Sequence, residues 1–160
     1  YSDADKEAVL ATFLSQTGYA TPKVDVRAAV IKDDMILLVK ERTDGLWAMP
    51  GGWADVGDKP SQVAVRETFE ESGYHVKAEK VIGVFDANRS GNPLELFHAY
   101  KIIFLCTVKS GHAATSSETS EVGFFSFDNL PMLSSNRTNE NHINEIMAHL
   151  KDPSRHVYFD

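Results

Sequence analysis

The sequence predicts one mixed α+β domain in which a central sheet has helices packed against it. Two observations lead to this prediction. Runs of apolar and β-branched residues of strand length recur along the chain, and helical patterns with their own start and stop signals lie between and after them. The chain of 160 residues contains no repeat, low-complexity block or linker that would divide it.

The first element is a helical pattern over residues 3–16, which Gly18 and Pro22 end. We therefore expect an N-terminal helical segment, 1–22, followed by the main domain, 23–160. We interpret the segment either as a separate helix or as the remnant of a longer helical extension; the sequence begins with Tyr1 rather than Met.

The main domain opens with a predicted hairpin, since two apolar strand patterns, 24–30 and 35–39, flank the polar turn Lys32-Asp33-Asp34. A short extended piece follows and ends at Pro50-Gly51-Gly52. The best helix of the chain then runs from Pro60, which suits a first helical turn, to Gly73, which suits a C-terminal cap. Further elements complete the domain: strands at 80–86, 99–108 and 122–127, loops at 87–93 and 112–120, and a last helix at 139–150.

The apolar stripe of the last helix indicates packing in the core or against a second copy, which leaves a homodimer open. The stripe consists of Ile143, Ile146, Met147 and Leu150. None of the six histidines has the spacing of a metal site, and we expect them in loops, at helix surfaces and, for His98, in a strand.

The composition narrows the classes of function. Cys106 is the only cysteine and lies in an apolar run, so we expect a buried thiol, no intramolecular disulfide and a cytoplasmic protein. No apolar run has the roughly 20 residues that a membrane-spanning helix needs, and no export signal is recognisable. The net charge of −7 and the lack of a basic stripe argue against a nucleic-acid partner.

The central helix places three carboxylates together. At 100° per residue, Glu67, Glu70 and Glu71 fall within an arc of about 100°. They repel one another and lie toward the C-terminal end of the helix, where the macrodipole disfavours anions. A hard divalent cation would compensate this cost, because Mg²⁺ and Mn²⁺ prefer carboxylate oxygens. A solvated acidic face is the alternative for these three residues alone.

The residues around this arc match the Nudix box, G-x5-E-x7-R-E-U-x-E-E-x-G-U, at every spacing from Gly52 to Tyr74. The sequence therefore resembles the Nudix hydrolases. Two positions depart from the pattern: Asp58 stands where the family has Glu, and Thr68 where it has an aliphatic residue. Neither departure removes a carboxylate that the chemistry requires, so we expect an active site. The shorter side chain of Asp58 could lower its activity.

The resemblance implies an α/β/α sandwich and a set of roles. Glu67, Glu70 and Glu71 would bind the metal, with the carbonyl of Gly51 as a further ligand. Arg66 would hold Glu67 by an ion pair, and Gly52 and Gly73 would support the site. A loop carboxylate would complete the site as base or ligand. We choose Glu118 because it lies deeper in its loop, and Glu121 is the alternative.

The stretches Trp47–Gly57, Lys23–Arg27 and Phe97–Lys101 resemble the Nudix group described as ADP-ribose pyrophosphatase-like or as hydrolases of nucleoside diphosphates linked to X, some of which prefer CDP-choline. The implied substrate is a nucleotide sugar or a similar small molecule. Candidates for contacting it are Arg27, Arg89 and Trp53, the last as a stacking platform for a base. The alternatives are another Nudix substrate, such as a nucleoside triphosphate or a capped RNA, and a nucleotide sensor without catalysis.

Overall fold

The computed structural model describes residues 6–15, 21–87 and 98–160. In order along the chain, these residues form α1 (Lys6–Ser15), β1 (Lys23–Lys32), β2 (Met35–Glu41), β3 (Trp47–Ala48), β4 (Gly51–Trp53), α2 (Pro60–Ser72), β5 (Tyr74–Asp86), β6 (Ala99–Gly111), β7 (Thr119–Ser126), α3 (Glu140–Lys151) and β8 (Tyr158–Phe159).

The strands of the described residues join in one mixed sheet, whose main order is β3-β2-β1-β6-β5-β8. Strand β1 runs parallel to β6 and antiparallel to β2 and β4, while β7 pairs with β2. The predicted hairpin is confirmed: Asp33 and Asp34 both have positive φ angles, 52° and 59°, as a two-residue type I′ turn requires.

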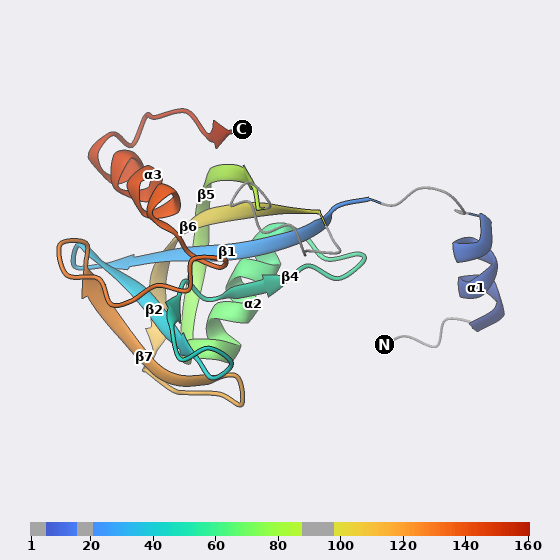
Figure 1. The fold of residues 1–160 in the computed structure, drawn as a ribbon, viewed down its shortest axis with the longest axis horizontal. Coiled ribbons are helices and arrows are strands. Elements are labelled where there is room, and N and C mark those ends of the chain that lie inside the picture. Colours follow the sequence, from blue (N-terminus) through green and yellow to red (C-terminus); the bar gives the residue numbers. More distant parts are fainter. Residues whose placement is uncertain (1–5, 16–20, 88–97) are drawn as a thin grey trace.

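Helices cover the two faces of this sheet (Figure 1). Alternate residues of β1 point to opposite faces, so Val26, Ala28 and Val30 pack with residues of α2, whereas Ala29 packs with residues of α3. Each face thus has its own apolar core. The expected α/β/α arrangement is confirmed.

The apolar stripe of α3 belongs to the core and does not form a free surface. Ile143 and Ile146 are buried, and Met147 and Leu150 pack against the same cluster. The sequence analysis was wrong about His142 and His149, which are also buried. His142 completes the capping box with Asn139 and lies edge-on to Phe85.

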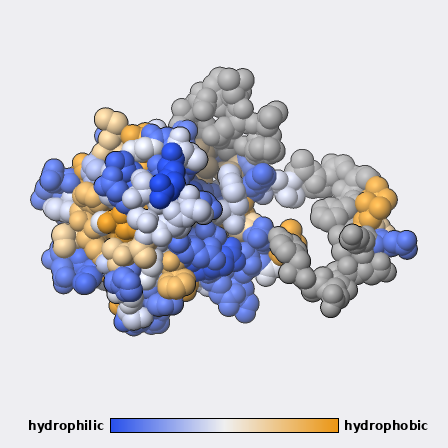
Figure 2. All heavy atoms as spheres, turned by 90° about the horizontal axis from the view of Figure 1, so that it is seen from below, coloured by the Kyte–Doolittle hydropathy of each residue, from blue (hydrophilic) through white to orange (hydrophobic). Residues whose placement is uncertain are grey.

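The N-terminal helix stands apart from the sheet in Figure 1. Two of its leucines, Leu10 and Leu14, are exposed, and Figure 2 shows hydrophobic and hydrophilic residues side by side on the surface of the molecule. Phe69, at the edge of the packed face of α2, stacks on His75 with ring centroids 4.1 Å apart. None of the helices in the described ranges is long and apolar enough to cross a membrane.

One strand prediction was wrong in its start, and one strand was missed. Strand β5 begins at Tyr74 rather than near Lys80, because its first half alternates polar and apolar residues and pairs with β6 through register shifts. Strand β8 is two residues long and gave no recognisable pattern. The predicted loop at 87–93 lies almost entirely outside the described residues, while Cys106 is buried as expected.

Candidate active site

The site is built where β1 changes its partner. Near the hairpin β1 pairs with β2, but farther back it pairs with β4, where Arg27 lies opposite Gly51 and Val26 opposite Gly52. Gly51 has a φ of 150°, and a Cβ there would lie 2.0 Å from the carbonyl oxygen of Val26. Only glycine allows this close approach of the two backbones.

Helix α2 then presents its carboxylates to the same glycines. The amide of Gly51 donates a hydrogen bond to Glu71 Oε2 at 2.9 Å, and a Cβ at Gly52 would lie 3.2 Å from Glu67 Oε2. Gly73 ends the helix in the left-handed conformation with a φ of 78°, as the sequence predicts. The two glycines of the turn therefore bring the strand within reach of the helix.

The small polar residues of α2 fill its buried face without leaving donors unpaired. Thr68 and Ser72 are fully buried, and each hydroxyl donates to the carbonyl of the residue four positions earlier. Thr68 thus replaces an aliphatic residue without burying an unsatisfied polar group.

Glu71 is a buried carboxyl with more negative than positive neighbours. It is 6% exposed. Burial raises its pKa to about 8; the Gly51 amide and Arg27 oppose this rise, and Glu41 and Glu67 add to it. Such an environment favours a neutral carboxylic acid unless a cation is supplied.

Glu67 and Glu70 extend this acidic surface toward solvent. Burial raises the pKa of Glu67, Arg66 opposes the rise, and the charges of Glu70 and Glu118 add to it. Glu70 itself is exposed.

Arg66 links two acidic side chains of the motif. Its Nη2 lies 3.1 Å from Glu67 Oε1, as the resemblance implies, and its Nη1 lies 3.0 Å from Asp58 Oδ2. Asp58 also accepts from the amide of Asp55. These hydrogen bonds lower the pKa of Asp58 and keep it ionised. The shorter aspartate therefore still reaches the arginine that holds Glu67.

The two loop glutamates differ in their surroundings. Glu121 forms an ion pair with Lys40 at 2.7 Å on the surface. Glu118 is exposed and lies close enough to Glu67 to raise its pKa. Its neighbour Thr119 is buried and donates to the carbonyl of Glu71, which ties the loop to α2. This placement favours Glu118 over Glu121.

Arg27 is buried, with little of its side chain open to solvent. Its Nε lies 3.0 Å from Asp25 Oδ1, and its Nη1 donates to the carbonyl of Met49 at 3.1 Å. It therefore holds the segment that leads into Gly51. Arg89 lies outside the described residues.

A pocket of about 330 Å³ adjoins this arginine. Trp53, which is 54% exposed, lines it, and Lys23 Nζ lies 5.5 Å from the centre of the Trp53 ring. Within the part of the chain that the structure describes, the lining consists of Asp25, Arg27, Trp53, Ala87, Ala99, Asn136 and Arg137.

Sequence reasoning missed three residues near this pocket: Glu41, Lys101 and Arg137. Lys101 is 1% exposed, and its Nζ donates to the carbonyls of Asn136 and Arg137 at 2.8 and 2.7 Å. Burial lowers its pKa to about 8, and the carboxylate of Asp25 at 3.4 Å opposes that change. The one sequence signal for these residues was Lys101 itself, a charged residue near the start of an apolar strand pattern.

The carboxylates offer the donor chemistry that a divalent cation needs, but two of them, Glu67 and Glu71, are hydrogen-bonded to protein groups. Within residues 6–15, 21–87 and 98–160, no three acidic, histidine or cysteine side chains are close enough together to hold a metal ion. One oxygen of Glu67 is bonded to Arg66, and one of Glu71 to Gly51. The mutual repulsion of these carboxyls nevertheless suits a cation as a partner.

Comparison with known proteins decides the family. The NUDIX domain profile matches residues 21–150. The chain belongs to the Nudix family. It is a hydrolase of that family, and the box expected from Gly52 to Tyr74 is the segment that forms β4, α2 and their connection.

Similar proteins include two named as ADP-ribose pyrophosphatases and one named as a UDP-X diphosphatase. A Bacillus subtilis (strain 168) relative named "Putative ADP-ribose pyrophosphatase YjhB" is 36% identical over 160 residues, which is 100% of this chain and 77% of the relative. The crystal structure of an ADP-ribose pyrophosphatase from Streptococcus suis 89-1591 is 36% identical, has a TM-score of 0.78, and covers 88% of this chain and 100% of its own. That of a UDP-X diphosphatase is 34% identical, has a TM-score of 0.81, and covers 99% of this chain and 77% of its own.

Proposed function

We propose that this Nudix hydrolase cleaves the diphosphate linkage of a nucleoside diphosphate linked to a group X, of the ADP-ribose or CDP-choline type. The products are a nucleoside monophosphate and phospho-X. Water adds to one phosphorus, the bridging P–O bond breaks, and the bridging oxygen leaves with the other phosphate. The names of the similar proteins support this substrate class.

The observation on which the proposal rests is the buried carboxyl of Glu71 beside Glu67 and Glu41. Glu67, Glu70 and Glu71 would hold Mg²⁺ or Mn²⁺, with the Gly51 carbonyl and Glu118 as further donors. When bound, the ion supplies positive charge that offsets the carboxylates and the diphosphate and makes a nearby water more acidic.

The side chains of the site then have separate tasks. Arg66 fixes Glu67, and the Gly51 amide fixes Glu71. Glu118 is exposed beside Glu67 and accepts the proton of the attacking water. Trp53 offers an aromatic face to a base, and Arg27 lines the same pocket.

The test is incubation with ADP-ribose and with CDP-choline in Mg²⁺, with identification of the products. We expect a nucleoside monophosphate from at least one of them. Glu70→Gln should lower turnover by orders of magnitude, while circular dichroism shows an unchanged fold, because Glu70 is exposed. Unchanged turnover of Glu70→Gln, or hydrolysis of nucleoside triphosphates only, would overturn the proposal.

A further inference from the structure

Arg137 brings a second guanidinium to the pocket that Trp53 lines. Among the described residues, the charged side chains of the pocket wall are those of Arg27, Arg137 and Asp25. Asp25 is ion-paired with Arg27 and lies 3.4 Å from Lys101. Arg137 is paired with Asp44 and Glu41, which do not line the pocket. The described side chains of the wall thus present two guanidiniums and one carboxylate, which suits an anion.

The two guanidiniums differ in what they can still bind. Arg27 is 8% exposed and donates to Asp25 and to the Met49 carbonyl. The side chain of Arg137 is 30% exposed. Arg137 is thus the more accessible cation of the wall.

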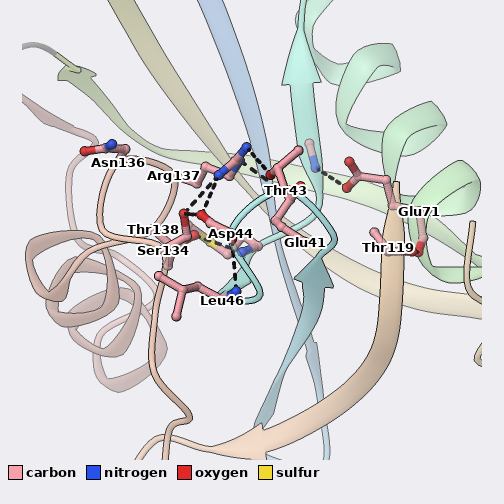
Figure 3. Close-up of polar contacts among 12 residues, drawn as sticks. Glu41, Thr43, Asp44, Leu46, Glu71, Thr119, Ser134, Asn136, Arg137 and Thr138 are labelled. Carbon is pink, nitrogen blue, oxygen red and sulfur yellow. Dashed lines mark hydrogen bonds and ion pairs between the residues drawn. The ribbon is translucent and has the colours of Figure 1, made fainter. Parts of the chain in front are cut away.

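The direction of Arg137 is fixed by the turn between β2 and β3 (Figure 3). Its Nη1 lies 2.9 Å from Asp44 Oδ2, and its Nη2 donates to Thr43 Oγ1 at 3.3 Å. Asp44 also accepts from Ser134 Oγ at 2.7 Å and from the Leu46 amide at 2.9 Å. Asp44 therefore links its own turn, between β2 and β3, to the loop that contains Ser134 and Arg137.

The backbone of this loop is held independently of the guanidinium. Lys101 binds the Arg137 carbonyl, and Thr138 Oγ1 accepts from the Met49 amide at 2.9 Å. A change confined to the end of the Arg137 side chain leaves these contacts in place.

A count of donors shows what Arg137 has left. A guanidinium has five N–H groups. Among the described residues, two from Nη1 and one from Nη2 enter hydrogen bonds, to Asp44, Ser134 and Thr43. Its Nε lies 3.6 Å from Glu41 Oε1, an ion pair beyond hydrogen-bond distance. Two N–H groups, that of Nε and the second of Nη2, thus have no hydrogen bond within the described ranges.

We propose that Arg137 donates to a phosphate oxygen of the bound diphosphate and that Asp44 orients it for this contact. The inference rests on the proposed function. It names a substrate-binding residue outside the Nudix box, on the loop before α3. A planar guanidinium suits phosphate oxygens, and the preset direction lowers the entropy lost on binding.

The activity of the wild-type protein decides which ligands the experiment uses. Whichever of ADP-ribose and CDP-choline it hydrolyses faster sets the ligands: the α,β-methylene analogue, the matching nucleoside monophosphate and the nucleoside alone. Inhibition constants are measured for Arg137→Met, Arg137→Lys and Asp44→Asn. The matched control is Arg155→Met, which removes an arginine that is paired with Glu145 and does not line this pocket.

We expect Arg137→Met to weaken both phosphate-bearing ligands about 10- to 100-fold, as the loss of a hydrogen bond to a charged group does. The nucleoside should bind as to the wild type. Arg137→Lys keeps the positive charge but lacks the planar guanidinium, so its affinity for these two ligands should fall less. The affinity of Asp44→Asn should also fall less. Arg155→Met should change nothing.

Two results would overturn the inference while the proposed function stands. One is unchanged inhibition by the phosphate ligands in Arg137→Met and Arg137→Lys. The other is an equal loss for the nucleoside, which would show that Arg137 only supports the pocket wall. If the wild type hydrolyses neither substrate, the proposed function fails and the inference fails with it.

Discussion

The buried carboxyl of Glu71 predicts a stability that depends on both pH and metal. Its pKa is raised from 4.5 to about 8. A carboxyl whose pKa is higher in the folded than in the unfolded protein makes its full contribution to stability at low pH. This contribution is lost as the pH rises from about 4.5 through about 8.

The size of the effect follows from the same values. One pH unit corresponds to about 1.36 kcal/mol per group, so ionising Glu71 in the metal-free protein costs at most about 5 kcal/mol. Half of that would still lower the Tm of a domain of this length by several degrees. Bound Mg²⁺ favours the ionised carboxyl and should restore the lost stability.

The assay compares the wild type with Glu71→Gln in thermal unfolding from pH 5 to pH 9, first in EDTA and then in Mg²⁺. Glutamine keeps an acceptor for the Gly51 amide but does not titrate. Burial lowers the pKa of His142 to about 3, so this histidine makes the folded protein less stable as the pH falls below 6.5. That pH dependence is opposite to the one expected from Glu71, and the wild type and Glu71→Gln share it. Their difference therefore isolates Glu71 and its neighbours Arg27, Glu41 and Glu67.

In EDTA the wild type should lose stability relative to Glu71→Gln as the pH rises, and Mg²⁺ should remove much of that loss. Parallel stability curves for the two proteins in EDTA would refute the reasoning, because a carboxyl with an ordinary pKa gives no such difference.

Two further predictions concern the glycine turn and the loop glutamates. Gly51→Ala forces a Cβ into the backbone of β1 and should lower the free energy of unfolding by several kcal/mol. In Gly52→Ala the new Cβ meets only the end of a glutamate side chain, so this variant should lose less than about 1 kcal/mol while its turnover falls. Similar unfolding midpoints for the two variants would contradict this. Glu118→Gln should lower turnover about 10²-fold or more, and Glu121→Gln, which removes only a surface pair with Lys40, should leave turnover within about twofold. The reverse order would assign the base to Glu121.

The sequence predicted the parts of the fold and site that depend on local chemistry. The Asp33-Asp34 turn, the Pro60 start and the Gly73 end of α2 follow from backbone preferences, and the structure confirms them. The helical period placed Glu67 and Glu71 on one face, where both carboxyls meet the glycine turn.

The rest depended on contacts between distant segments. Arg137 reaches Asp44 across 93 residues, and Lys101 meets Asp25 only because β6 lies parallel to β1. The sequence offered Arg27 as a candidate for contacting the substrate, but it did not show that the pairing of β1 with β4 buries this arginine beside Met49. No local pattern predicts such pairings, so these roles emerged only from the three-dimensional arrangement.

The most direct test of the central claim is hydrolysis of ADP-ribose in H₂¹⁸O with Mg²⁺, followed by mass spectrometry of the products. If ADP-ribose is the better of the two proposed substrates, the account predicts AMP and ribose 5-phosphate, with one ¹⁸O atom in the phosphate of one of them and no reaction in EDTA. If CDP-choline is the better, it predicts CMP and phosphocholine from that substrate, labelled in the same way. Label in the sugar ring, release of the free base, or equal turnover in EDTA would contradict metal-dependent cleavage of the diphosphate.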